Sequence, residues 1–92
     1  MAGLLRVEHA ELGPLVIFSN PASTSGRHHM TLKVSRDEGA SWPEAWHTLY
    51  DQRAGYGYSC LTEVGEESVG VLYEGARELY FLRFALRTLV GD

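Results

Sequence analysis

The sequence predicts an all-β fold made of short antiparallel strands, of the propeller or sandwich kind. Helical periodicity is weak, and short runs in which apolar and polar residues alternate recur along the chain. Stretches rich in Gly, Pro, Asn and Asp separate these runs and supply the backbone conformations that chain reversals need. At 92 residues the chain suffices for one small domain. We expect strands over residues 4–9, 14–19, 28–35, 45–50, 57–64, 68–74 and 78–86.

The clearest alternation lies in the run 28–35, where Met30, Leu32 and Val34 share one face of the expected strand. The run 78–86 is also compatible with an amphipathic helix, but its aromatic content favours a strand. Several aromatic side chains are expected in the core rather than at a ligand site: Trp46, Tyr73, Tyr80, Phe81 and Phe84.

Composition argues against some partners. The net charge is −4 and the eight Lys and Arg residues are scattered, so no basic face for nucleic acid is expected. No apolar run approaches the roughly 20 residues of a membrane-spanning helix, and the first residues lack the apolar stretch of a secretory signal. Cys60 is the single cysteine, so it cannot form an internal disulfide. We expect this small, apolar residue to be buried. The histidines lack the spacing of metal ligands, so no metal site is expected.

Residues 35–42 match the pattern S-x-D-x-G-x-x-W, which is called an Asp box. Asp37 can accept hydrogen bonds from turn amides, Gly39 can take a conformation closed to residues with a Cβ, and Trp42 can cover the hairpin. In families that carry it, the box lies between the third and fourth strands of a propeller blade, away from the ligand. The motif therefore indicates a fold and not a site.

The motifs around the box extend this interpretation. In chain order they are Phe18-Ser19-Asn20-Pro21-Ala22, Arg27, Met30-Thr31-Leu32-Lys33-Val34-Ser35, the box with Trp42-Pro43, Gly57-Tyr58-Ser59-Cys60-Leu61 and Val71-Leu72-Tyr73-Glu74. The series resembles the C-terminal third of the exo-α-sialidases, six-bladed β-propellers that remove terminal sialic acid. The resemblance spans about residues 4–89, and it departs from the family at Cys60, where relatives often carry Asp or Ser.

The resemblance implies that residues 1–92 form part of a propeller, with a complete blade at about 4–50 and an incomplete blade at about 57–88. Three expected strands in the second blade leave sheet edges open to self-association. Sialylated glycans are the implied partners, and no cofactor is implied. A secreted or periplasmic location is what bacterial relatives suggest, by analogy alone.

The resemblance also assigns roles to three residues. Tyr58 matches the family's tyrosine nucleophile, because the Gly-Tyr-Ser-x-Leu string centres on it rather than on Tyr56. Arg27 matches an arginine that binds the sialic acid carboxylate through a guanidinium fork. Glu74 matches a glutamate that holds another arginine of the site in place. The alternatives are a tyrosine packed on a sheet, a surface arginine and a solvated carboxylate.

Chain direction alternates between strands, so Arg27, Tyr58 and Glu74 are all expected at one end of the propeller and the Asp box at the other. The family's acid/base aspartate, its first two arginines and the glutamate that activates the tyrosine precede the matched region. We therefore expect this chain alone to be inactive. Two other interpretations stay open: a non-catalytic Asp-box propeller that binds glycans or proteins, and a small stand-alone β protein.

Overall fold

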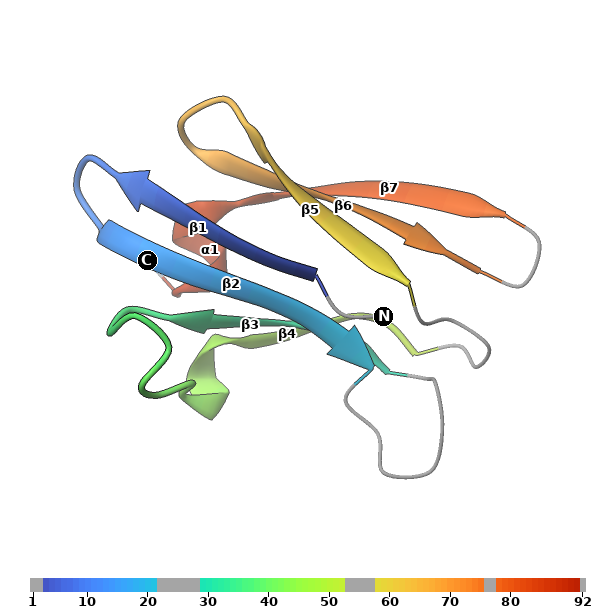
Figure 1. Cartoon of the computed structure of the whole chain (residues 1–92), viewed down its shortest axis with the longest axis horizontal. Coiled ribbons are helices and arrows are strands. Elements are labelled where there is room, and N and C mark those ends of the chain that lie inside the picture. The colour runs from blue at the N-terminus through green and yellow to red at the C-terminus, as the bar shows by residue number, and fades with distance from the viewer. Residues whose placement is uncertain (1–2, 22–28, 53–57, 76–77, 92) are drawn as a thin grey trace.

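Two antiparallel β-sheets stacked face to face make up the computed structural model (Figure 1). The structure describes residues 3–21, 29–52, 58–75 and 78–91. The first sheet has the order β1-β2-β3-β4, with β1 at Gly3–His9, β2 at Gly13–Pro21, β3 at Met30–Ser35 and β4 at His47–Asp51. The second sheet has the order β5-β6-β7, with β5 at Ser59–Val64, β6 at Ser68–Glu74 and β7 at Leu79–Ala85. The described residues also contain a 3-10 turn, η1 (Glu44–Trp46), and a short helix, α1 (Leu86–Leu89).

The predicted all-β fold is confirmed, and the strands occur where the alternation places them, with shifted ends. The strand expected over 28–35 starts at Met30, because His29 has a φ of 61°, a left-handed conformation that extended strands do not adopt. The ambiguous run 78–86 forms β7 and then enters α1 at Leu86. Its mixed pattern therefore reflects a strand and a helical turn in succession.

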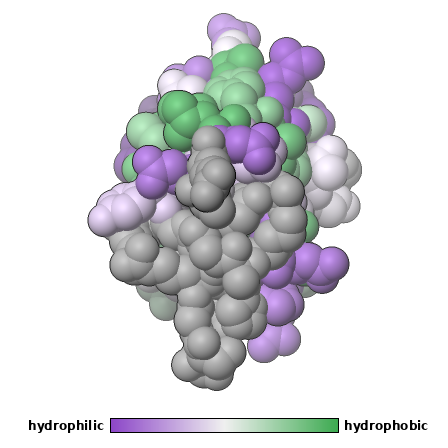
Figure 2. Space-filling model, turned by 90° about the vertical axis from the view of Figure 1, so that its right-hand side faces the viewer, coloured by the Kyte–Doolittle hydropathy of each residue, from purple (hydrophilic) through white to green (hydrophobic). Residues whose placement is uncertain are grey.

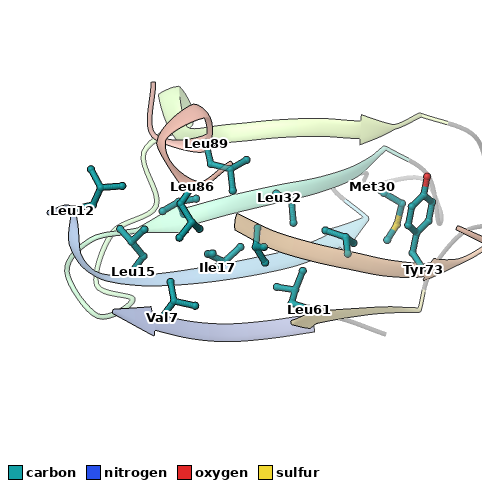
Figure 3. Close-up of a cluster of buried hydrophobic side chains, with 13 residues drawn as sticks. Val7, Leu12, Leu15, Ile17, Met30, Leu32, Leu61, Tyr73, Leu86 and Leu89 are labelled. Atoms are coloured by element: carbon teal, nitrogen blue, oxygen red, sulfur yellow. The ribbon is translucent and has the colours of Figure 1, made fainter. Parts of the chain in front are cut away.

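The core lies between the two sheets, and the alternation along each strand decides which side chains enter it (Figure 3). Helix α1 adds Leu86 and Leu89 to the same cluster. Burying one aliphatic side chain of this kind contributes roughly 1.5–3 kcal/mol, so the contact between the sheets is the main source of stability. The most deeply buried apolar side chains come from β2, β3 and β6: Leu15, Ile17, Met30, Leu32, Val34, Val69 and Val71.

The outer face of the second sheet is apolar and exposed. Cys60, Leu72 and Phe81 are register partners in one row across β5, β6 and β7, and all three are exposed. The prediction that Cys60 and Phe81 are buried is therefore wrong, because both lie on the face turned away from the first sheet. The other aromatic residues expected in the core are buried or packed against it: Trp46, Tyr73, Tyr80 and Phe84.

The Asp box forms a hydrogen-bonded turn directly after β3. The Ser35 hydroxyl donates to Asp37 Oδ1 at 2.6 Å and accepts the Gly39 N–H at 2.9 Å. Asp37 also accepts the Ser41 N–H at 2.8 Å and the Ser41 hydroxyl at 2.5 Å. Gly39 has a φ of 90°, which favours glycine, and its carbonyl accepts the Trp42 indole N–H at 3.0 Å. The hydrogen bonds from Ser35 and then Ser41 lower the pKa of Asp37 from its usual 3.8 to about 2.

Polar side chains join β1 to the Asp box and to the second sheet. Arg6 of β1 donates to Glu38 in the box, from Nη2 at 2.8 Å and from Nε at 3.0 Å. His9, at the end of β1, is buried, and its Nε2 lies 2.7 Å from Oε1 of Glu67 in the turn between β5 and β6. The Nδ1 atom of His9 accepts the Leu12 N–H at 3.0 Å, so in the neutral ring Nε2 carries the proton that faces Glu67.

We predict that the Asp37→Asn substitution flattens the acid dependence of stability. Because the pKa of Asp37 is lowered by folding, its carboxylate stabilises the native state above pH 3.8, and this contribution is lost as the pH falls from 3.8 towards 2. Chemical unfolding at several pH values should show a smaller fall over this interval for the variant than for the unsubstituted chain. Glu44→Gln, which changes an exposed carboxylate outside the box, is the control and should keep the original slope. Identical slopes for all three chains would contradict the prediction.

Candidate functional site

Tyr58 and Glu74 meet at the end of the second sheet where β5 begins and β6 ends. The Glu74 N–H donates to the Tyr58 carbonyl oxygen at 3.0 Å, which extends the β5–β6 ladder by one residue pair. The Tyr58 side chain is 55% exposed, and Glu74 is exposed as well. The main-chain hydrogen bond therefore places a phenol and a carboxylate on neighbouring strands at one accessible edge.

This end of the molecule lies opposite the Asp box (Figure 1). Strand β1 runs beside β5: Gly3 at its start packs against Ser59, whereas its other end and the β5–β6 turn line one pocket. Strand β2 ends and β3 begins beside the start of β1, and the box follows the far end of β3. The prediction that Arg27 joins Tyr58 and Glu74 falls on a residue outside the described part of the chain.

A shallow pocket lies between the start of β5 and the end of β6. Tyr58, Ser59 and Glu74 are among its polar members, and Cys60, Leu72 and Leu79 give it an apolar wall. Figure 2 looks onto this end and shows apolar surface over the second sheet, at the top of the view. The pocket can therefore present a hydroxyl and a carboxylate to a ligand beside an apolar surface.

A buried and a part-buried hydrogen bond on the inner side of the sheets support this end, and neither was predicted from the sequence. The Tyr73 hydroxyl of β6 donates to Asp51 Oδ2 at the end of β4, at 3.0 Å. The hydroxyls of Tyr50 and Ser19 lie 2.7 Å apart, and burial raises the pKa of Tyr50. The rings of Tyr50 and Tyr73 meet edge to face with centroids 4.9 Å apart. One signal was available in the sequence: Ser19 is a polar residue on the face of β2 that otherwise buries apolar residues.

The described residues contain no group of three or more His, Cys, Asp or Glu side chains that could hold a metal ion. Within the same part of the chain, no helix has the length and apolar character needed to cross a membrane.

Comparison with known proteins places this chain beside sialidases. A sialidase of Bacteroides fragilis (strain YCH46) is 42% identical over 79 residues, which cover 83% of this chain and 14% of the relative. A sialidase of Micromonospora viridifaciens is 32% identical over 77 residues, which cover 84% of this chain and 11% of the relative. The solved structure of the Hadza microbial sialidase Hz136 matches 96% of this chain with a TM-score of 0.85 and 37% identity. No protein-family model matches the chain.

These similarities confirm the resemblance drawn from the motif series. The alternation left a propeller and a sandwich open, and the match to a solved sialidase structure favours the propeller. The chain spans only a small part of its relatives: 14% and 11% of the two curated sialidases, and 18% of the solved structure. The described sheets are thus a part of a sialidase β-propeller.

We predict that Tyr73→Phe lowers the free energy of unfolding by about 1–3 kcal/mol, because it removes a donor from the buried Asp51 carboxylate. Leu72→Val is the matched control: it changes the next residue on the same strand, whose side chain is exposed on the opposite face, and should stay within about 0.5 kcal/mol. Urea unfolding of the two variants measures the difference. An equal loss in both would show that the Tyr73 hydroxyl makes no special contribution.

Proposed function

Because the chain is homologous to sialidases and has the fold of a part of their β-propeller, we propose that the protein it belongs to is a retaining exo-α-sialidase. The protein releases terminal α-linked sialic acid from glycoconjugates. This chain contributes the nucleophile, Tyr58, and a carboxylate-binding residue, Arg27. The four-stranded sheet serves as a complete blade and the three-stranded sheet as an incomplete one.

The observation that carries the proposal is the position of Tyr58. Its phenol is exposed beside the Glu74 carboxylate, at the end opposite the Asp box, in a chain with high similarity to sialidases. The neighbouring tyrosines Tyr50 and Tyr73 use their hydroxyls in hydrogen bonds to Ser19 and Asp51, of which the first is part-buried and the second is buried. Among the tyrosines that the structure describes, Tyr58 is the one in the exposed class, and its phenol can meet a sugar from solvent.

The chemistry of sialic acid favours a phenol over the carboxylate nucleophile that most glycosidases use. Its anomeric carbon bears a carboxylate, which repels a negatively charged nucleophile and leaves a neutral phenol unaffected. In the first step the Tyr58 oxygen bonds to the anomeric carbon while its proton passes to a base elsewhere in the full-length protein. The glycosidic bond breaks, and its oxygen takes a proton from an acid that also lies outside this chain. Water then displaces the phenol oxygen: the water gives a proton to the group that acted as the acid in the first step, and the phenol oxygen recovers its proton from the base.

Arg27 and Glu74 have supporting roles in this proposal. A guanidinium fork meets a carboxylate with two parallel charged hydrogen bonds, so Arg27 anchors the sialic acid carboxylate. Glu74 lies one strand away from Tyr58 and presents a carboxylate at the same edge. There it orients another arginine of the site, which fixes the sugar relative to the attacking oxygen.

We predict that Tyr58→Phe in the full-length protein lowers kcat for a fluorogenic sialoside by at least about 100-fold, because phenylalanine keeps the ring and removes the attacking oxygen. Tyr80→Phe makes the same chemical change at a half-buried residue of β7 that stacks on Tyr73 and lies outside the pocket. This control should keep kcat within about threefold.

Turnover by Tyr58→Phe at the control's rate would remove Tyr58 from the mechanism. An inactive full-length protein that still binds sialosides would instead favour a non-catalytic, glycan-binding propeller. The isolated 92-residue chain should show no turnover, because the proposed acid and base lie outside it.

A further inference from the structure

The hydrogen bond between Tyr73 and Asp51 joins the two sheets at the end that carries the candidate site. The Tyr73 hydroxyl of β6 donates to Asp51 Oδ2 of β4 at 3.0 Å, and the two residues are only 3% and 9% exposed. In Figure 3 the Tyr73 hydroxyl points away from β6 and towards the first sheet. The contact therefore links one sheet to the other from within the space that they enclose.

On the second sheet, Tyr73 is one step away from both groups of the candidate site. Glu74 follows it in the chain, and its register partner on β5 is Ser59, the residue after Tyr58. The hydrogen bond from the Glu74 N–H to the Tyr58 carbonyl closes the next pair of the same ladder. A shift of Tyr73 relative to the first sheet therefore moves Tyr58 and Glu74 with it, because a ladder joins its strands residue by residue.

On the first sheet, Asp51 lies at the end where β3 begins. Asp51 is the last residue of β4, and its register partner is Met30, the first residue of β3. The proposed carboxylate-binding residue, Arg27, precedes β3 in the chain. The hydrogen bond thus joins the strand that continues into Glu74 to the end of the first sheet that follows Arg27 in the sequence.

We propose that Asp51 and Tyr73 are positioning residues for the sialidase reaction, an inference that rests on the proposed function. Their hydrogen bond holds the strand ends that carry Tyr58 and Glu74 at a fixed place relative to the first sheet. The pair acts through the main chain on the position of the phenol oxygen when the sugar is bound. A displacement of about 1 Å at a reacting group can slow an oriented reaction about 100-fold, so a contact of this kind can govern the rate.

The contacts of Tyr73 separate alignment from packing. Its ring meets the Tyr50 ring edge to face with centroids 4.9 Å apart and stacks on the Tyr80 ring at 5.4 Å. Tyr73→Phe keeps the ring that makes these contacts and removes the hydroxyl alone. Because a hydrogen bond is directional, its loss lets the two sheets shift relative to each other while the aromatic packing persists.

We predict that Tyr73→Phe in the full-length protein slows the first chemical step about 10- to 100-fold. With enzyme in excess over a fluorogenic sialoside, the saturated rate constant for fluorophore release reports the attack by Tyr58, and the half-saturating concentration of folded enzyme reports binding. That concentration should stay within about threefold, because the substitution changes none of the groups assigned to the sugar. Partial unfolding lowers the concentration of active enzyme and leaves the saturated rate constant unchanged, so a merely structural hydrogen bond would not produce the predicted effect.

Two further variants complete this experiment. Tyr80→Phe makes the same chemical change in the ring that stacks on Tyr73 and should keep the rate constant within about threefold. If Tyr58→Phe is inactive and Tyr73→Phe is as fast as the unsubstituted protein, the positioning role alone is overturned. If Tyr58→Phe releases the fluorophore at the original rate, the proposed function fails and the positioning role fails with it.

A second measurement tests whether the two residues act through each other. Asp51→Ala removes the acceptor and should slow fluorophore release at least as much as Tyr73→Phe does. Adding Tyr73→Phe to Asp51→Ala should slow it by less than about a further twofold, because the hydrogen bond is already absent. An Asp51→Ala variant of unchanged rate, or a double variant in which the two losses multiply, would refute the positioning role.

Discussion

The structure depends on the contact between its two sheets. A four-stranded and a three-stranded antiparallel sheet each have one face of alternating aliphatic residues, and neither can exclude water from that face alone. Stacked against each other they enclose a shared core to which β2, β3 and β6 contribute most. The same packing brings β1 beside β5, and the candidate site lies where β5 begins.

The two ends of the stacked sheets are secured in different ways. At the Asp-box end, polar side chains cross between elements: Arg6 reaches Glu38, and His9 reaches Glu67 of the second sheet. At the other end the link is buried, with the Tyr73 hydroxyl on Asp51 and the Tyr50 ring against Tyr73. A rigid, buried support beneath an exposed phenol and carboxylate suits a site that must hold its groups in a fixed arrangement.

Much of the fold could be predicted from the sequence, because local patterns determine it. Met30, Leu32 and Val34 alternate with polar neighbours, and the Asp box specifies its own turn through side-chain hydrogen bonds. The exposure of Cys60 and Phe81 could not be predicted in this way. Alternation shows that two faces differ, but burial depends on what covers each face, and the second sheet is covered on one side by the first sheet.

In the candidate site, too, features set by local sequence could be predicted, and features set by contacts between distant segments could not. Strand alternation was enough to expect Tyr58 and Glu74 at one end, and their main-chain hydrogen bond places them there. The buried partners Ser19 and Asp51 were not predicted, because they are brought to Tyr50 and Tyr73 by contacts between strands far apart in the sequence. The role of Arg27 stays a prediction.

At Glu38 the backbone conformation and the side-chain contact favour different residue types. Its backbone φ of 59° lies in a region that asparagine and glycine enter more easily than glutamate, yet its carboxylate is what ties Arg6 of β1 to the box. Asparagine or glycine at this position would ease the backbone conformation and would also remove the carboxylate that Arg6 contacts. Glutamate at this position therefore accepts a less favourable backbone conformation and in return forms an ion pair with a residue far away in the sequence. We expect a substitution here to weaken the contact between β1 and the Asp-box turn, while the turn itself still forms.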